Sequence, residues 1–291
     1  MTIRIATLFA RHGAAKYPDA LDHLEEFYRQ RLPGARRELV VIDNALPSAG
    51  CEPLGPGRTL IGGSNGAWEF SAWDGGIAFL AERLASFDLV HLVTSAFNQL
   101  HTRYIDRFDL PMLEALRGTA AAVGHIDRFN DPVELLGRHS QSWLRTSFLF
   151  LPPAEIRLLG RLASLPDGAA FFSGEPAHPF RPDAPLSVSF QANILGWLTG
   201  EGTGQGIAWH SRFDLSLATL PIFEAKSLAM LNEHALTLRL RAQGCAIVDA
   251  TWLAARLARH DRPWRPVGGI PHWRVQLAQR DVDAVPFEPD A

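Results

Sequence analysis

Short apolar runs alternate with amphipathic stretches along the first half of the chain. The run at 3–11 is mostly apolar, as in a strand, and leucines and aromatics at 17–32 recur every three or four residues, as on one face of a helix. This order then repeats, which predicts a parallel, doubly wound sheet flanked by helices. Strands are predicted at 3–11, 39–42, 59–63, 87–94 and 118–127, and a sixth strand followed by a helix within 142–162.

The second half of the chain is less regular and begins with a proline-rich connection at 171–186. A long helical pattern then stops at Gly244, a residue that favours the left-handed conformation found just after a helix. The predicted elements are a helix at 188–198, a glycine-rich loop at 199–206, a long helix at 221–244, a short strand and a helix within 245–260, and an irregular tail after Arg262.

The turn after the third predicted strand, GGSNGAWEFSAWDGGIAFLAE, is rich in glycine and tryptophan. Gly62 and Gly63 would let the backbone pass close to a ligand. Asn65 is expected to cap the helix that follows, and Trp73 is expected in the core because it shares a helix face with other apolar residues. Glu69 would favour the helix N-terminus through the helix dipole, an interpretation preferred over a catalytic role.

Polar residues follow five of the predicted strands. Because ligands of open parallel sheets bind beyond the carboxyl ends of the strands, we expect these residues along one functional edge. Taken singly, each also has a structural interpretation: a turn for Asp43 and Asn44, and a hydrogen-bonded core histidine for His125. The residues are Arg11, His12 and Gly13, then Asp43 and Asn44, then Gly63, Ser64 and Asn65, then Thr94, Ser95, Ala96 and Asn98, and finally His125 and Asp127.

Composition narrows the classes of function. The 291 residues, 47% hydrophobic and 20% charged, suit one large α/β domain or two small ones. A net charge of -3 provides no basic surface for nucleic acid. The two cysteines, Cys51 and Cys245, are far apart and suit a reducing cytoplasm. No apolar run approaches the ~20 residues of a membrane span; a peripheral contact with a membrane surface stays compatible with the sequence.

Three places where nucleotide or hydrolase motifs could be expected do not contain them. No Gly-x-Gly-x-x-Gly follows the first strand, and the loop at 199–206 lacks the Lys-Ser/Thr of a P-loop. His139 and Ser142 are close in sequence, but Ser142 does not lie in a Gly-x-Ser-x-Gly motif. The sequence therefore argues against a classical dinucleotide fold, a P-loop enzyme and a hydrolase triad.

Three segments in this order, VVIDNALP, GGSNGAWEFSAWDGGIAFL and FDLVHLVTSAFN, resemble the nucleotide-sugar half of a GT-A glycosyltransferase of the family-2 or rhamnan-synthesis type. The segment AAAVGHIDRFNDPVELLGRHSQSWLRTSFLFL is similar to the acceptor-side strands of those bacterial enzymes. The resemblance covers about Ile3 to Leu151, with a weaker match at LNEHALTLRLRAQG. It implies a GT-A-like α/β fold in which 1–150 bind the nucleotide sugar and 151–291 form an irregular, partly helical acceptor-side half of one continuous domain.

The resemblance implies an enzyme that moves a sugar from a nucleotide-diphosphate sugar to a glycan or lipid-linked acceptor in surface polysaccharide synthesis. The alternative is a non-catalytic relative that binds nucleotide sugars or serves as a scaffold in a polysaccharide locus. In the first case Asp43 would contact the base or ribose, and Asn65 the nucleotide or the sugar. Glu233 would be the base that deprotonates the acceptor, against the alternative of a solvated helix acid. The implied binding residues are Arg11, Asp43, Asn65, Ser95, Asn98, His101 and His125, and the implied catalytic acids are Glu233 and Asp127.

The resemblance also implies Mg²⁺ or Mn²⁺, which such enzymes hold with an acidic motif after the fourth strand. Here that place reads VTSAFN and contains no carboxylate, so we assign no metal ligand. Three explanations stay open. A metal-independent enzyme would neutralise the diphosphate with Arg11, Arg103 or His101; a metal-dependent one would recruit another acid such as Asp127; or the activity is lost. The first explanation is favoured over the second.

Overall fold

The computed structural model describes residues 2–99, 102–165, 167–200, 214–259 and 269–283. The strands are β1 (Arg4–Arg11), β2 (Arg36–Asp43), β3 (Cys51–Gly55), β4 (Arg58–Gly62), β5 (Leu89–Thr94), β6 (Ala121–Gly124), β7 (Ile126–Leu135), β8 (Arg138–Leu144), β9 (Phe148–Leu151) and β10 (Ala246–Asp249). The α-helices are α1 (Ala20–Arg31), α2 (Trp68–Leu80), α3 (Leu110–Leu116), α4 (Pro153–Leu159), α5 (Val188–Thr199), α6 (Leu220–Ala242), α7 (Ala250–Ala258) and α8 (Trp273–Asp283), with short 3₁₀ helices η1 (Ala81–Ser86) and η2 (Ile105–Arg107).

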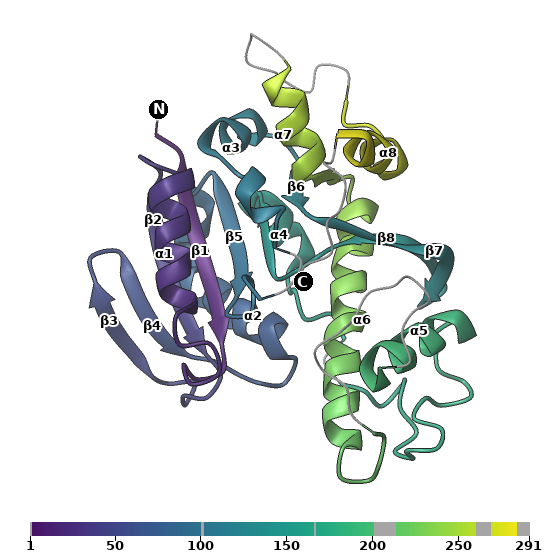
Figure 1. Cartoon of the computed structure of the whole chain (residues 1–291). Coiled ribbons are helices and arrows are strands. Elements are labelled where there is room, and N and C mark those ends of the chain that lie inside the picture. Colours follow the sequence, from purple (N-terminus) through teal and green to yellow (C-terminus); the bar gives the residue numbers. More distant parts are fainter. Residues whose placement is uncertain (1, 100–101, 166, 201–213, 260–268, 284–291) are drawn as a thin grey trace.

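Eight of the described strands form one mixed sheet in the order β10-β6-β9-β5-β1-β2-β4-β3 (Figure 1). Six of them run parallel to one another, and β3 and β9 run antiparallel to their neighbours. β7 and β8 form a separate antiparallel hairpin. The mostly parallel α/β sheet is therefore confirmed, and the carboxyl ends of β1, β2, β4, β5 and β6 lie at one edge, together with the amino end of β9.

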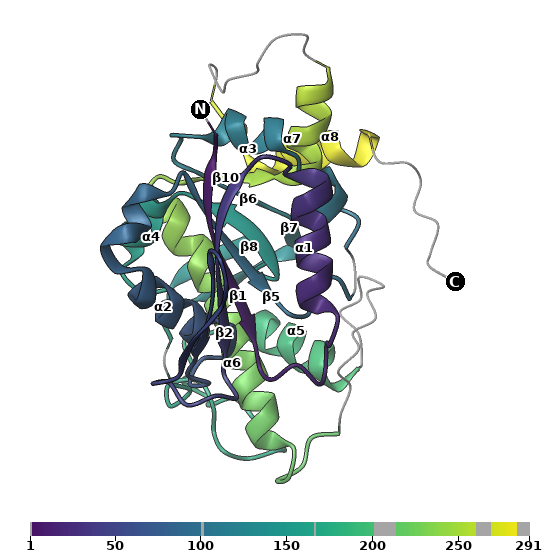
Figure 2. The same cartoon turned by 90° about the vertical axis from the view of Figure 1, so that its left-hand side faces the viewer.

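Helices cover both faces of this sheet. α1, α3 and α7 pack on one face, and α2, α4 and the second half of α6 pack on the other (Figure 2). Trp73 of α2 is fully buried and donates a hydrogen bond from Nε1 to the Leu8 carbonyl of β1, at 3.1 Å. The prediction of a core position for Trp73 is therefore confirmed.

A third apolar cluster lies away from the sheet, where β7, β8 and α5 pack on the first half of α6 (Figure 1). Phe223 and Leu231 of α6 belong to this cluster, whereas Leu236 and Leu240 belong to the sheet core. α6 therefore joins the two cores, and Glu233 lies at the junction between them. The predicted end of this helix is confirmed, because Gly244 follows it with a φ of +86°.

The turn into α2 corrects two expectations. A Cβ on Gly62 would lie 1.7 Å from the Pro47 carbonyl oxygen, so this glycine makes room for the loop after β2 rather than for a ligand. Asn65 does not cap the helix: the cap residue is Ala67, and no side chain caps it. Ser71 instead accepts a hydrogen bond from the Ala67 amide and donates one to the Trp68 carbonyl.

Two further expectations differ from the structure. The tail after Arg262 is not irregular throughout, because α8 occupies 273–283 and buries Gln276 against β10. The segment 118–127 is not one strand, since β6 ends at Gly124 and the hairpin begins at Ile126. The antiparallel edge strand β3 was not predicted. Of the glycine-rich loop, Gly200 follows α5 in a left-handed conformation, and 201–206 lie outside the described residues.

Candidate functional site

The five polar segments predicted to share an edge do so. In the sheet register Arg11 pairs with Asp43, Asp43 with Gly62, and Ala10 with Thr94. Thr94 also donates its amide to the Ser147 carbonyl, which brings the turn between β8 and β9 to the same edge. The roles of these residues stay predictions, but their side chains fall into distinct groups with different chemistry.

The first group is centred on Asp43, at the end of β2. Its Oδ2 accepts a hydrogen bond from Arg11 Nε at 2.7 Å, and its Oδ1 accepts from the amides of Gly13 and Ala45 at 2.7 and 3.0 Å. Burial alone would raise the pKa of Asp43, but these donors outweigh it and hold the pKa below its ordinary value. Asp43 is thus an ionised carboxylate that fixes the loops after β1 and β2.

The other residues predicted to bind the nucleotide sugar make few contacts with one another. Asn65 is exposed and accepts a hydrogen bond from Asn44 Nδ2 at 3.3 Å. Ser95 donates its amide to the Ala10 carbonyl, so its backbone continues the sheet edge. Asn98 instead contacts the ring of His23 on α1. His101 lies outside the described residues.

The second group surrounds Asp127, at the start of β7. Arg145 binds it in a bidentate arrangement, with Nε 3.0 Å from Oδ2 and Nη2 3.1 Å from Oδ1. His125 Nε2 lies 3.3 Å from Asp127 Oδ1, and the buried ring of Tyr104 packs against the imidazole, with centroids 4.9 Å apart and ring planes tilted by 31°. Burial opposes ionisation of Asp127, but Arg145 and His125 outweigh it and hold the pKa well below its ordinary value.

The third group is centred on Glu233, in the middle of α6. Its Oε1 accepts hydrogen bonds from the amide and the hydroxyl of Thr146, at 2.7 and 2.9 Å. Burial raises the pKa of Glu233 to about 7, with the Asp127 charge adding to it and the Thr146 donors and Arg145 opposing it. The interpretation of Glu233 as a solvated helix acid is therefore wrong. A partly buried carboxyl that titrates near neutrality is suited to general acid–base chemistry.

A second carboxyl of similar character, Glu69, lies in the first turn of α2. Burial, with a smaller contribution from the charge of Glu233, raises its pKa to about 7. The expected position of Glu69 at a helix N-terminus is confirmed. The roles of Arg145 and Thr146 were not predicted; their signal in the sequence is their position in the short turn before a buried strand.

Asp249, at the end of β10, contacts the residues that carry the Asp127 group. Its Oδ2 accepts hydrogen bonds from the Ile126 amide at 3.1 Å and from Arg280 of α8 at 2.8 Å, and it lies 4.0 Å from His125 Nδ1. The side chain is fully buried. α8 therefore fixes the start of the hairpin that carries His125 and Asp127.

The donor set does not suit a divalent cation. In the part of the chain that the structure describes, no three His, Cys, Asp or Glu side chains converge closely enough to hold a metal ion. Asp127, the acid named as a substitute ligand, has both oxygens bonded to Arg145. Mg²⁺ and Mn²⁺ require several oxygen ligands, which these described side chains do not supply together.

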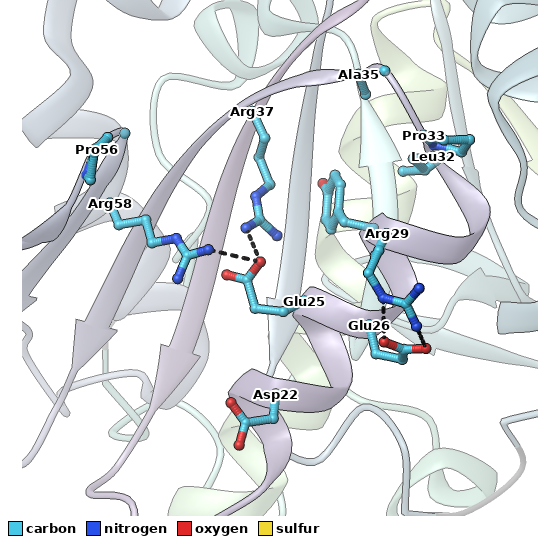
Figure 3. A pocket seen from close by; sticks show the side chains of 13 residues that line it. Asp22, Glu25, Glu26, Arg29, Leu32, Pro33, Ala35, Arg37, Pro56 and Arg58 are labelled. Atoms are coloured by element: carbon cyan, nitrogen blue, oxygen red, sulfur yellow. Dashed lines mark hydrogen bonds and ion pairs between the residues drawn. The ribbon is translucent and has the colours of Figure 1, made fainter.

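A pocket of about 740 Å³ lies at the opposite edge of the sheet, between α1, the start of β2 and the turn before β4 (Figure 3). Glu25 bridges two guanidinium groups there, 2.5 Å from Arg37 Nη2 and 3.3 Å from Arg58 Nη2. Its acids and arginines neutralise one another, and none of the residues predicted for function lines it. The candidate site is therefore the carboxyl edge rather than this pocket.

Comparisons with known proteins give structural likeness but no sequence match. The sequence matches no protein-family model and no curated protein. The mannosyltransferase PcManGT from Pyrobaculum calidifontis, solved in complex with GDP-Man and Mn²⁺, is similar over 97% of this chain and 87% of that chain, with 13% identity and a TM-score of 0.37. Values this low do not establish a common family. No helix in the described ranges has the length and apolar character needed to cross a membrane.

Proposed function

We propose that the chain is a GT-A-like glycosyltransferase, which transfers a sugar from a nucleotide-diphosphate sugar to a glycan or lipid-linked acceptor in surface polysaccharide synthesis in the cytoplasm. The observation that carries the proposal is Glu233, held by Thr146 with a pKa of about 7, beside the Asp127–Arg145 pair at the carboxyl edge of the sheet. The resemblance of the strand-end motifs to GT-A enzymes supports the same assignment.

In this mechanism Glu233 accepts the proton of the acceptor hydroxyl as that oxygen attacks the anomeric carbon of the donor. The bond from the acceptor oxygen to the sugar forms, the bond from the sugar to the diphosphate breaks, and the nucleoside diphosphate leaves with the bonding electrons. Asp127 stays ionised and is therefore a positioning residue for Arg145 and His125 rather than a second base.

The donor would lie along the edge from β2 towards β6, the strand that precedes His125 and Asp127. Asp43 and Asn65 are proposed to contact the nucleoside end, with Asp43 acting through the loops that it fixes. Because neighbouring strands lie about 4.8 Å apart, four strand spacings separate β2 from β6 by roughly 19 Å. This arrangement requires an extended ligand, which suits a nucleotide joined to a sugar.

Thermal shift with UDP-, GDP- and dTDP-sugars, each with and without Mn²⁺, tests the binding part of the proposal. We expect one donor class to raise the Tm, and addition of an acceptor to release the nucleoside diphosphate. If a donor raised the Tm but no acceptor led to release of the nucleoside diphosphate, the non-catalytic binding protein would be favoured. Absence of stabilisation by every donor would contradict both.

Glu233→Gln tests the catalytic part. The amide keeps the shape of the side chain but does not accept a proton, so turnover should fall by on the order of 10²–10⁴-fold while the thermal shift by the donor is kept. Glu224→Gln, the same change nearer the start of α6 in a partly buried position, is the control. Equal turnover for the two variants would remove Glu233 from the mechanism.

A further inference from the structure

Two acids lie on opposite sides of the His125 imidazole. Its Nε2 is 3.3 Å from Asp127 Oδ1, whereas its Nδ1 is 4.0 Å from Asp249 Oδ2, which is beyond hydrogen-bond distance. Nδ1 is buried and has no hydrogen-bond partner among the residues that the structure describes. Because buried polar atoms normally find a partner, some other contact must keep the imidazole directed to Asp127 rather than to Asp249.

The Asp249 carboxylate already has its donors. Oδ2 accepts hydrogen bonds from the Ile126 amide at 3.1 Å and from Arg280 Nη1 at 2.8 Å, and Oδ1 accepts from the Trp252 amide at 3.0 Å, where it caps α7. The Asp249 side chain is fully buried and that of Arg280 is 16% exposed. A carboxylate oxygen has two lone pairs, so an oxygen with two donors has no capacity left for a third.

The same guanidinium nitrogen holds the backbone next to His125. Arg280 Nη1 donates to the Ile126 carbonyl at 3.2 Å, while Asp249 accepts from the amide of the same residue. The ion pair therefore binds both backbone polar groups of Ile126. The His125 carbonyl accepts from the Arg145 amide at 2.9 Å, so the backbone is fixed at His125 itself and at the residue after it.

We propose that Arg280 of α8 is a positioning residue that decides which acid the His125 imidazole faces. With Arg280 in place, Asp249 Oδ2 is occupied and its charge is offset, so the imidazole keeps its contact with Asp127. Without the guanidinium, Asp249 would present a buried oxygen that lacks a donor, 4.0 Å from Nδ1. The imidazole would then supply the missing donor from Nδ1 and leave Asp127.

α8 has a second anchor that does not reach this site. The helix packs on β10 and α7 (Figure 1). Gln279 Oε1 accepts a hydrogen bond from Trp252 Nε1 of α7 at 2.7 Å. Gln279→Leu removes this contact between the helices and leaves the bond from Arg280 to Asp249 in place. It is therefore a matched control for any loosening of α8.

NMR of the His125 ring nitrogens tests the proposal without any substrate. Arg280→Met should move the Nδ1 signal towards that of a protonated nitrogen, whereas Gln279→Leu should leave it in place. Arg280→Gln, which keeps a donor without the charge and disturbs packing less, should move it by a smaller amount in the same direction. Arg280→Lys keeps the charge and should restore the wild-type signal.

Three results would overturn the proposal: an unchanged Nδ1 signal in both Arg280→Met and Arg280→Gln, a shift of equal size in Gln279→Leu, or no recovery in Arg280→Lys. The last two would mean that the His125 signal reports only how α8 is packed, which is a structural role.

The effect on catalysis rests on the proposed function, in which His125 binds the donor, and the two fail separately. Arg280→Met should raise the KM for the donor by about 10-fold, as is typical of residues that orient a binding histidine. The kcat should change much less, because Thr146 and not Arg280 holds Glu233. A shifted Nδ1 signal without turnover of any donor would leave the role of Arg280 and remove the glycosyltransferase. Turnover with an unchanged KM and an unchanged Nδ1 signal would do the reverse.

Discussion

At the scale of single residues, the partner of each carboxylate decides its chemistry. Asp127 and Glu233 come from different elements and interact electrostatically, yet Arg145 keeps the first ionised while burial raises the pKa of the second to about 7. A permanent anion is a poor proton acceptor, because a base is most effective when its pKa lies near the working pH. The difference therefore assigns positioning to Asp127 and proton transfer to Glu233.

Thr146→Val tests how the Glu233 pKa is set. Valine keeps the shape of threonine but removes the hydroxyl that donates to Glu233 Oε1, while the amide donor stays. Loss of a donor to the charged form favours the protonated form, so the pKa should rise by about one unit. NMR titration of the glutamate side-chain carboxyl carbons measures this directly, and the acid limb of any turnover profile should move to higher pH.

The control for this change is Thr119→Val. The Thr119 hydroxyl donates a hydrogen bond to the carbonyl of Leu116, at the end of α3. It should leave the Glu233 titration in place. A Thr146→Val titration identical to that of the wild type would mean that the hydroxyl does not contribute to the ionisation of Glu233.

At the scale of elements, the turn into α2 is built by packing. The loop after β2 occupies the space that side chains on Gly62 and Gly63 would fill, with Pro47 and Asn44 as the nearest neighbours. The same Asn44 holds the Trp68 carbonyl from which α2 starts. The glycines, the loop after β2 and the start of α2 therefore depend on one another.

Gly62→Ala and Gly66→Ala separate packing from ligand approach. The new Cβ at Gly62 would lie 1.7 Å from a backbone oxygen, whereas the nearest atom at Gly66 is 3.6 Å away. We expect Gly62→Ala to lower the free energy of unfolding by about 3 kcal/mol, and Gly66→Ala to change it by less than about 1 kcal/mol. Urea unfolding measures both; a stable Gly62→Ala that only weakens donor binding would restore the ligand interpretation.

Helices and strands with a clear apolar periodicity could be predicted from the sequence. The direction in which a strand runs within the sheet could not. β1, α1 and the end of α6 at Gly244 follow from apolar spacing and a cap residue. β9 is a run of four residues buried on both faces, which has no period that distinguishes parallel from antiparallel pairing. In β7, Pro132 falls within the irregular register and interrupts the strand pattern.

In the candidate site, too, some features could be predicted from the sequence and others could not. The polar residues after the strands could be placed at one edge, because parallel strands share the direction of their ends. The bonds from Thr146 to Glu233 join residues that are 87 positions apart and depend on a hairpin that was not predicted. Arg145 reaches Asp127 through the same hairpin. Contacts of this range follow from tertiary packing, which local patterns do not encode.

At the scale of the whole molecule, α6 connects the sheet core to the aromatic cluster around β7, β8 and α5. Next to Glu233 on this helix, His234 enters the aromatic cluster and is almost fully buried. Its ring stacks on Phe129 with centroids 5.3 Å apart and lies 4.2 Å from the Trp143 ring. Burial lowers the pKa of His234 to about 3, so the imidazole is neutral in the folded protein near pH 7.

This histidine should make the fold sensitive to acid. A base whose pKa is lowered by folding binds fewer protons in the native state, so its contribution to stability is present above the unfolded pKa of 6.5 and is lost as the pH falls from 6.5 towards 3. His234→Phe removes that loss and keeps an aromatic ring in the cluster. Relative to the wild type, the variant should gain roughly 2–3 kcal/mol of unfolding free energy between about pH 7 and pH 4.

Urea unfolding at the two pH values measures this change. The comparison is with His139→Phe, in which the replaced imidazole is exposed on β8. That variant should differ from the wild type by the same amount at both pH values, because its side chain is in water before and after unfolding. The contrary outcome is that the free energy of unfolding of His234→Phe falls with acid as steeply as that of the wild type. In that case protonation of His234 would not cause the loss of stability, and the carboxylates at the sheet edge would have to cause it.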